Sequence, residues 1–390
     1  MTVWVIEARD PLIFRDGRPF DAVPGTRAVS LPFPFPSTTA GAVRTRAGQD
    51  GEGRFQKDAI SWVKQIAVNG PLLVELDRNT GDIARWLVHS PSDALPLESD
   101  SPEGDRAMLK RLVPLEVPSD TYTDLPEGLS LVGMPRPDFR KPSKKAPRYW
   151  YWEPFEEWLV NPEDQNVDLE GIGHDGPVRE ARVHVGIDAE TGAADVERGA
   201  LFQTRGLEFT RSRGGSNPGD AHRLALAVAT ETLNLRDGLG FLGGERRLAV
   251  WRKSNASLPA CPDRLRSHIS RNRHCRVVLL TDAHFEMGWR PTWLLNQIEG
   301  VIPKLKAIAI GRPHVVSGWD MAERGPKPAR RLAPAGTVLF LELNGNDDAI
   351  DRWVDKIWLS PVSDGEQDRL DGFGLAALGA WDGTLRRMEA

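Results

Sequence analysis

The order of strand-like and helix-like segments constrains the fold of this chain more than any other feature. Short stretches rich in β-branched and apolar residues are typical of strands. They cover residues 2–8, 71–90, 181–211, 222–233, 246–253, 275–285 and 337–344. Helical spacing of apolar residues marks 37–46, 58–68, 293–308 and 348–359. Because strands and helices alternate in two rounds with hairpins between them, the pattern predicts an α+β fold rather than an all-parallel sheet.

The first helix should begin at Ser37 or Thr38. Prolines in the preceding LPFPFP exclude regular structure, and a Ser or Thr hydroxyl can cap free backbone N–H groups. Arg44 and Arg46 then fall in the body of this short helix. The last predicted helix, at 348–359, carries its apolar residues on one stripe, which is typical of a helix packed on a core.

Length and charge limit the possible functions. A chain of 390 residues is long enough for two domains. With 40% hydrophobic and 27% charged residues, it has the composition of an ordered globular protein. Its net charge of −5 argues against a protein that coats nucleic acid or anionic membrane over its whole surface. Any site for an anion must therefore be local.

The sequence predicts a cytoplasmic protein without a membrane partner. The opening MTVWVIEARD does not resemble a signal peptide, and no apolar run approaches the length of a membrane span. Two cysteines suit a reducing compartment. Cys261, His268, His274 and Cys275 are four potential zinc ligands, but they lack the spacing of a zinc knuckle. We therefore predict ordinary thiols and histidines, with no metal and no cofactor.

Residues 93–175 read as a long, loop-rich insertion. They contain prolines, a basic cluster, an aromatic run and an acid-rich tail, and long loops are either functional or mobile. The basic cluster is expected either to be solvated and balanced by nearby acids or to meet phosphate; its members are Lys141, Lys144, Lys145 and Arg148. Trp150, Trp152 and Trp158 are expected to anchor packing. We expect residues 155–172 to be dispensable for the core fold.

One glycine motif is misleading. Gly238, Gly240 and Gly243 spell G-x-G-x-x-G, which binds dinucleotides only between a strand and a helix. Here the residues before it form no buried strand, and those after it, 247–251, are β-like. The motif therefore predicts turns rather than a nicotinamide or flavin site. The chain also lacks a P-loop sequence.

Arginines gather beside glycine and proline turns. In RDPLIFRDGRPF, Arg15 and Arg18 flank an Asp16-Gly17 turn, with Asp10 nearby. Other such arginines are Arg205, Arg211, Arg213, Arg246, Arg247, Arg330 and Arg331. They form surface Arg–Asp pairs, or they grip phosphates or carboxylates with their guanidinium groups. If RNA binds, Trp319 could stack a base.

Several of these stretches resemble one protein family. The motifs are RDPLIFRDGRPFD, PFPSTTAGAVRT, LGGERRLAVW, SGWDM with GPKPARRLAPAGTVLFLEL, and GFGLAALGAW. They are similar to the RAMP proteins that form subunit three of the type III-B (Cmr) CRISPR effector, relatives of the fifth Cas family. The motifs run from the N-terminus to the last residues, so the resemblance covers the whole chain.

This resemblance implies a fold and a role. The fold would be two ferredoxin-like (RRM-related, RAMP) domains, at 1–215 with the insertion around 93–175 and at 216–390 with a terminal glycine-rich loop. The role would be non-catalytic, within an RNA-guided antiviral complex. The protein would capture the repeat-derived 5′ handle of the crRNA and dock on the large polymerase-like subunit and a neighbouring backbone RAMP subunit.

The resemblance also implies which residues contact RNA. The helix start at 37–46 and the terminal glycines would line a groove, and the turn at 243–247 would add a second contact. With the arginines, the predicted RNA-binding set is Arg15, Arg18, Ser37, Thr38, Arg44, Arg46, Arg205, Arg211, Arg213, Gly243, Gly244, Arg246, Arg247, Trp319, Arg330, Arg331, Gly372, Gly374 and Gly379.

Two other functions stay open from the sequence. RAMP relatives include endoribonucleases that process CRISPR RNA, and His222 and His314 are the residues suited to general acid–base work. A protein-only scaffold is the third reading, since the chain is acidic overall. A scaffold predicts salt-insensitive behaviour, whereas phosphate binding weakens with salt.

Overall fold

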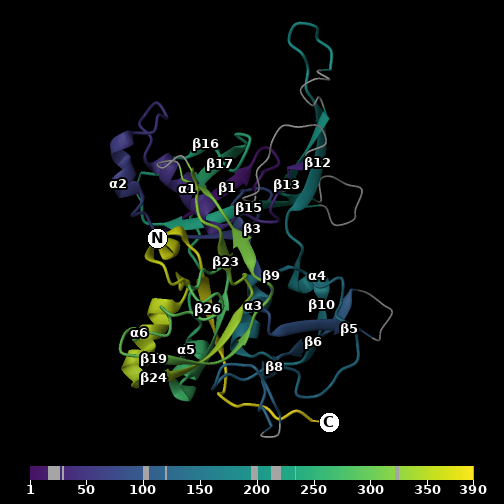
Figure 1. Ribbon diagram of the computed structural model, residues 1–390, viewed down its shortest axis with the longest axis vertical. Helices are drawn as coiled ribbons and strands as arrows, with labels where there is room; N and C mark the ends of the chain where they lie inside the picture. The colour runs from purple at the N-terminus through teal and green to yellow at the C-terminus, as the bar shows by residue number, and fades with distance from the viewer. Residues whose placement is uncertain are drawn as a thin grey trace.

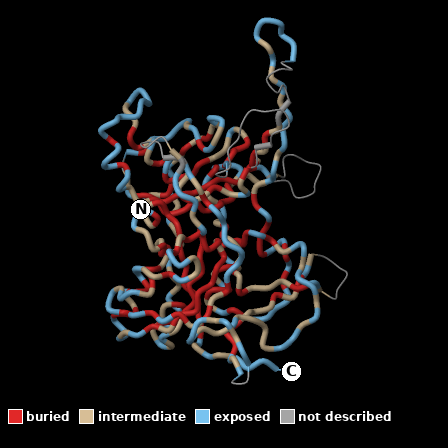
Figure 2. Tube along the Cα trace, in the orientation of Figure 1, coloured by how far each residue is buried: buried red, intermediate tan, exposed pale blue. Residues whose placement is uncertain are grey.

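The computed structural model describes residues 1–15, 27–28, 30–99, 105–118, 121–194, 201–211, 221–232, 234–320 and 325–389. Figure 1 shows two sheet-containing bodies stacked along the long axis of the molecule, with a hairpin rising from one end. Buried residues form a continuous column through both bodies, so the two cores meet in the middle (Figure 2).

The N-terminal body is built on a nine-stranded antiparallel sheet in the order β11-β9-β4-β3-β15-β1-β17-β16, with β14 also paired to β15. Its strands are β1 (Thr2–Ala8), β3 (Val68–Leu76), β4 (Ile83–His89), β9 (Tyr149–Tyr151), β11 (Gly173–His174), β14 (Thr210–Arg211), β15 (His222–Thr230), β16 (Gly238–Phe241) and β17 (Leu248–Lys253). Helix α1 (Pro36–Ala47) packs on β3 and buries Ala40, Val43 and Ala47 in the core.

The C-terminal body has a five-stranded antiparallel sheet in the order β19-β24-β18-β26-β25. Its strands are β18 (His274–Leu279), β19 (Ile302–Ala309), β24 (Val338–Asn344), β25 (Ser360–Pro361) and β26 (Leu375–Ala380). Three helices contact β26, namely α3 (Trp152–Val160), α5 (Asp263–Asn272) and α6 (Asp347–Ile357). A short helix, α7 (Glu366–Asp371), contacts α1 and β3 of the other body.

Both bodies share one strand order. In the first it is β17-β1-β15-β3, and in the second it is β26-β18-β24-β19, which is fourth, first, third, second in chain order each time. Between these core strands, α1 follows the first strand of the N-terminal body and α6 precedes the fourth strand of the C-terminal body. The α+β class with antiparallel sheets is therefore confirmed.

The boundary between the bodies lies later than the sequence indicated. β15, β16 and β17 follow residue 215, yet all three belong to the N-terminal sheet. Strand β15 fills the place between β1 and β3, a pairing that the separation along the chain conceals. The pairing thus extends the N-terminal body to Lys253, and the C-terminal sheet begins at His274.

The loop-rich description of residues 93–175 is wrong for the two ends of the segment, which form regular elements, whereas 115–148 is mostly irregular. The whole segment contains β5 (Ala94–Glu98), β6 (Arg106–Arg111), β7 (Val113–Pro114), β8 (Val132–Gly133), β10 (Gln165–Asp168), α4 (Leu169–Ile172), and also β9, α3 and β11. Phe155, Trp158 and Leu159 of α3 are completely or almost completely buried against the C-terminal sheet. The three tryptophans are core residues, as expected.

Short elements complete the chain. They are β2 (Arg27–Ala28), η1 (Lys57–Ala59), α2 (Ile60–Val63), the projecting hairpin β12 (Val178–Val185) and β13 (Leu201–Glu208), and the pairs β20 (His314–Val316) with β23 (Arg330–Leu332) and β21 (Trp319–Asp320) with β22 (Gly325–Pro326). Within the described residues, no helix combines the length and apolar character needed to cross a membrane.

Three helix expectations need correction. The helix predicted at 58–68 is limited to η1 and α2, because the chain enters buried strand β3 at Val68. The helix predicted at 293–308 is absent: Glu299 and Gly300 have positive φ, and burial alternates along β19 with the period of a strand. The N-cap of α1 is Phe35 without a side-chain cap, since Pro36 already occupies the first turn.

Candidate nucleic-acid interface

A cavity of about 720 Å³ lies where the two bodies meet. The N-terminal body contributes the proline-rich stretch 31–36, the end of β4 at 89–92 and residues 148–149. The C-terminal body contributes 280–282 and 311–315. The volume suits a ligand the size of a nucleotide.

Three aromatic rings form one wall of the cavity. The centroids of His89 and Tyr149 are 4.5 Å apart, and Phe33 packs on both at 6.0 and 5.6 Å. The Tyr149 hydroxyl is buried without a hydrogen-bond partner in the described structure, and burial raises its pKa. Tyr149 is only 1% exposed, whereas the Phe33 ring is partly exposed and offers a surface on which an unstacked base can lie.

Three arginines line the same cavity. Arg148, Arg179 and Arg312 are exposed, and none forms an ion pair with any side chain that the structure describes. Unpaired guanidinium groups bind phosphate through two parallel N–H donors. Sequence reasoning noted Arg148 within a basic cluster but missed Arg179 and Arg312, because no local motif links them.

A histidine and an aspartate join the polar side of the cavity. Asp282 accepts a hydrogen bond from the backbone N–H of Ala335 at 2.7 Å, and its second oxygen lies 2.9 Å from Nδ1 of His314. This hydrogen bond raises the pKa of His314. His314 is half exposed, so its charged form adds to the positive potential of the cavity.

His89, in the aromatic wall of the cavity, makes the free energy of unfolding depend on pH. Burial lowers the His89 pKa from 6.5 to about 4. Between these values the unfolded chain binds a proton that the folded protein does not, so the free energy of unfolding falls as pH falls. We expect wild type to lose about 2 kcal/mol more than His89→Phe between pH 7 and 4.5. Denaturant titrations of both proteins measure this; equal losses would contradict it.

His314 acts with the opposite sign. Because its folded pKa is raised, its contribution is complete below the unfolded value near 6.5 and is lost as pH rises through the folded value. The two histidines therefore affect different pH windows, and the comparison below pH 6.5 reports on His89.

A second candidate contact lies on the N-terminal body, where two predicted motifs meet. The backbone N–H of Gly244 donates to the Ile13 carbonyl at 2.7 Å, and a Cβ on Gly244 would lie 3.5 Å from Cδ of Arg15. Gly243 has φ +79° and approaches Ile13 so closely that a side chain would clash. Arg246 is exposed beside this turn, with its guanidinium 4.8 Å above the Phe241 ring.

Arg247 is partly buried in the same turn. Its Nε has no hydrogen-bond partner among the described groups. The structure thus brings Arg15, Gly243, Gly244, Arg246 and Arg247 together, as the motifs suggested only separately. An exposed arginine beside a tight glycine turn is suited to an anionic backbone or to a carboxylate of a partner protein.

Arg44 and Arg46 contact other parts of the protein with their guanidinium groups. Arg44 pairs with Asp371 and donates to the carbonyls of Ile66 and Leu370, which ties α1 to α7. Arg46 donates to carbonyls beside β16, at 2.8 Å to Arg236 and 2.9 Å to Leu239. These contacts give both arginines a structural role in holding elements together.

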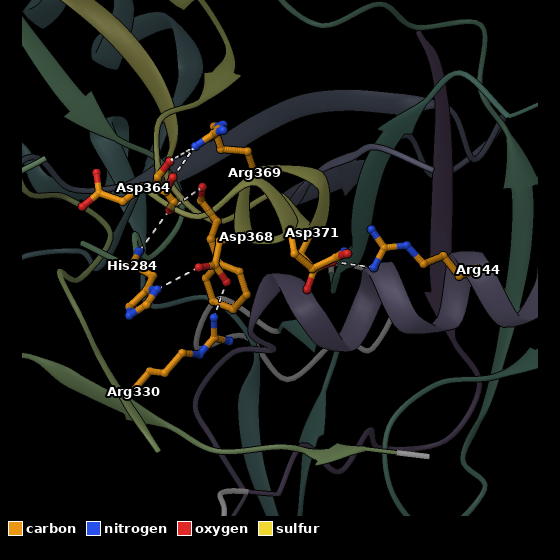
Figure 3. A network of polar contacts seen from close by, with 10 residues as sticks. Arg44, His284, Arg330, Asp364, Asp368, Arg369 and Asp371 are labelled. Atoms are coloured by element: carbon orange, nitrogen blue, oxygen red, sulfur yellow. Dashed lines mark hydrogen bonds and ion pairs between the residues drawn. The ribbon is translucent and has the colours of Figure 1, made fainter. Parts of the chain in front are cut away.

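Arg330 is also held internally, whereas its neighbour is not. Figure 3 shows His284 and Arg330 converging on Asp368, one at each oxygen of its carboxylate, with Arg44 and Asp371 at the far end of α7. The Arg330 guanidinium also lies 5.2 Å from the Phe373 ring. Arg331 is exposed and has no ion pair within the described part of the chain.

The terminal glycines serve close packing. Gly372 has φ +92° and abuts the Val68 carbonyl, and the Gly374 N–H donates to the Asp282 carbonyl at 2.7 Å. Gly379 lies inside β26, where a Cβ would come within 2.9 Å of the Arg276 guanidinium. All three are buried in this structure.

The remaining predicted residues are scattered. Ser37 and Thr38 are partly buried in α1, and Arg205 is partly buried in β13. Arg18 and Arg213 lie outside the described residues, and only the backbones of Arg211 in β14 and Trp319 in β21 are described.

The remaining candidates for catalysis or metal binding include His222 and the two cysteines. Nδ1 of His222 lies 3.2 Å from the buried Glu75 carboxylate. Burial raises the pKa of Cys261 to about 11 and also raises that of Cys275. Among the residues that the structure describes, no three potential ligands gather as a metal site would require.

Comparison with known proteins identifies the family. A family model described as CRISPR-associated protein (Cas_Cmr3) matches residues 4–381. Searching the curated proteins gives no match.

Solved structures offer more distant likenesses. One is "Cryo-EM structure of the Type III-B Cmr-beta bound to cognate target RNA", with 14% identity, a TM-score of 0.43, and coverage of 87% of this chain and 86% of that chain. The related structure with AMPPnP, state 1, has 14% identity, a TM-score of 0.41 and the same coverage. The Csm3-Csm4 subcomplex of the type III-A CRISPR-Cas interference complex has 11% identity, a TM-score of 0.33, and coverage of 89% and 94%.

The family match extends from the first strand to the residue after the last one, so it includes both bodies and the cavity between them. It also agrees with the resemblance drawn from the sequence motifs. This chain belongs to the Cas_Cmr3 family of CRISPR-associated proteins.

Proposed function

We propose that this protein is the non-catalytic subunit of a type III-B Cmr complex that holds the 5′ handle of the crRNA. The observation that carries the proposal is the cavity, whose lining includes both the aromatic rings and the three arginines without a described ion pair, Arg148, Arg179 and Arg312. One unstacked base would lie against the partly exposed ring of Phe33, and the phosphates of that nucleotide would meet the arginines.

Family membership supports the rest of the assignment. We interpret both bodies as ferredoxin-like domains, since each orders its core strands fourth, first, third, second, with one of the two expected helices between them. The proposal includes docking on the large polymerase-like subunit and on a neighbouring backbone RAMP subunit. The exposed turn at Arg246 is a second contact for RNA or for a partner carboxylate.

Binding of a handle oligonucleotide tests the proposal. We expect the full chain, alone or mixed with the large subunit, to bind a repeat-handle RNA more tightly than a scrambled one. Arg148→Ala with Arg312→Ala should weaken binding about tenfold at low salt. It should also reduce the salt slope by about 1.4, at about 0.7 for each lost phosphate contact.

Matched variants make this test specific. Arg271→Ala with Arg290→Ala removes two exposed arginines that have no described ion pair and do not line the cavity. This variant should keep the wild-type RNA affinity and salt slope. Arg246→Ala with Arg247→Ala probes the second contact. Equal binding of handle and scrambled RNA, or wild-type affinity in the folded cavity variant, would contradict the proposed site.

An endoribonuclease remains the second candidate because of one observation. His314 lines the cavity with Nδ1 bonded to Asp282, the arrangement that orients an imidazole for proton transfer at Nε2. The same binding mixtures test it. Cleavage products that disappear in His314→Ala would favour catalysis over holding.

A further inference from the structure

We propose that residues 139–148 form a track for single-stranded RNA leading out of the cavity, with Lys141 and Lys144 binding phosphates. This inference rests on the proposed function, because it extends an RNA strand whose first nucleotide occupies the cavity. Only Arg148 of the basic cluster lines the cavity. The track assigns a role to other members of the cluster.

The track is held rigidly against the protein. The Glu98 N–H donates to the Lys141 carbonyl at 2.8 Å, and the Ser143 N–H donates to the Pro96 carbonyl at 2.9 Å, so this part of the segment lies along β5 like an added strand. At the other end, the Arg148 carbonyl accepts from the Ser90 N–H at 2.9 Å. A surface fixed at both ends binds a ligand without a large loss of its own conformational entropy.

The charges of the segment divide into paired and unpaired groups. Residues 136–148 contain six basic side chains and one acidic side chain. Three cations are in ion pairs, namely Arg136 with Glu389, Arg140 with Asp138, and Lys145 with Asp105. Lys141, Lys144 and Arg148 are exposed and have no ion pair among the described residues. The nearby acids therefore balance half of the cluster and leave three unpaired cations at intervals along the segment.

An exposed aromatic residue, Phe139, precedes the three unpaired cations in the segment. Phe139 is 96% exposed, so nothing in the described structure covers its ring. Unpaired cations with an adjacent exposed aromatic are the two elements that bind single-stranded nucleic acid without sequence preference. Because Arg148 belongs both to the cavity lining and to the track, phosphates at the two places fit one continuous strand. This continuity favours RNA over an acidic protein segment.

The experiment compares two RNA lengths on the full-length protein. Labelled oligouridines of about four and about sixteen nucleotides, the range of such sites, are titrated at about 50 and 200 mM salt. Lys141→Gln with Lys144→Gln should weaken binding of the long RNA about tenfold and reduce its salt slope by about 1.4, while leaving the short RNA unchanged. Phe139→Ala should weaken the long RNA about fivefold without changing the salt slope.

The control carries the same charge change elsewhere. Lys64→Gln with Lys356→Gln removes two exposed lysines. Lys64 directly follows α2 and Lys356 lies in α6, and both elements are on the opposite side of the molecule from β5 (Figure 1). This control should bind both RNAs like wild type, and its melting temperature should match that of the Lys141 and Lys144 variant.

Each outcome separates the track from the cavity. If wild type binds both RNAs and the lysine variant does too with unchanged affinity and slope, the track is overturned while the proposed function stands. If the lysine variant keeps RNA binding but no longer binds the large subunit when the two are mixed, the surface is a protein contact and the track is again overturned. If the short RNA does not bind wild type, the cavity proposal falls first, and the track falls with it.

Discussion

We expect deletion of residues 155–172 to abolish the cooperative unfolding transition of this protein. The segment contains most of α3, and Phe155, Trp158 and Leu159 are at most 1% exposed between the two bodies. Truncating one such aromatic to alanine removes about 3–5 kcal/mol, and a whole domain is stable by only about 5–15 kcal/mol. Differential scanning calorimetry and near-UV circular dichroism measure the loss.

A graded variant and a matched change make this prediction sharp. Trp158→Ala should leave a transition that is weaker by about 3–5 kcal/mol. Replacing the exposed turn at 188–192 with two glycines should leave the transition intact, because these residues contribute no buried side chain. A deletion variant that melts cooperatively near the wild-type temperature would show that α3 is peripheral after all.

We expect Arg276→Met to destabilise the protein by about 3–5 kcal/mol, the usual effect of leaving a buried charge without its partner. Arg276 is completely buried, pairs with Asp93, and donates to the carbonyls of Ala380, Trp158 and Leu159. Asp93 also accepts from Nε1 of Trp158 at 3.0 Å, so one ion pair connects β18 to the inserted segment. Urea titrations measure the change in the free energy of unfolding.

Two comparisons test the cause. Arg264→Met removes an exposed arginine that pairs with Glu157, and it should change stability by less than about 1 kcal/mol. Asp93→Asn combined with Arg276→Met removes both charges and should recover part of the loss, because no buried charge then lacks a partner. If the double variant loses more stability than Asp93→Asn and Arg276→Met lose in total as single variants, packing rather than charge dominates at Arg276.

The sequence identified strands more reliably than helices, for a physical reason. β1, β17 and β24 are continuous or alternating apolar runs whose pattern appears within a few residues. The segment 293–308 has helical spacing, yet the positive φ at Gly300 and pairing with β24 turn its second half into β19. Partners distant in the chain decide such cases, and a local pattern does not contain them.

The sequence by itself determined the family and the α+β class, because motifs along the whole chain and the alternation of elements are local properties. Tertiary structure alone decided which arginines keep a guanidinium group without an internal partner. Arg44 and Arg148 are chemically identical, but Asp371, more than three hundred residues away, satisfies the first, while the second opens into a cavity. A guanidinium is available to phosphate only where folding brings no carboxylate or carbonyl to it, and that depends on contacts between segments that the chain keeps far apart.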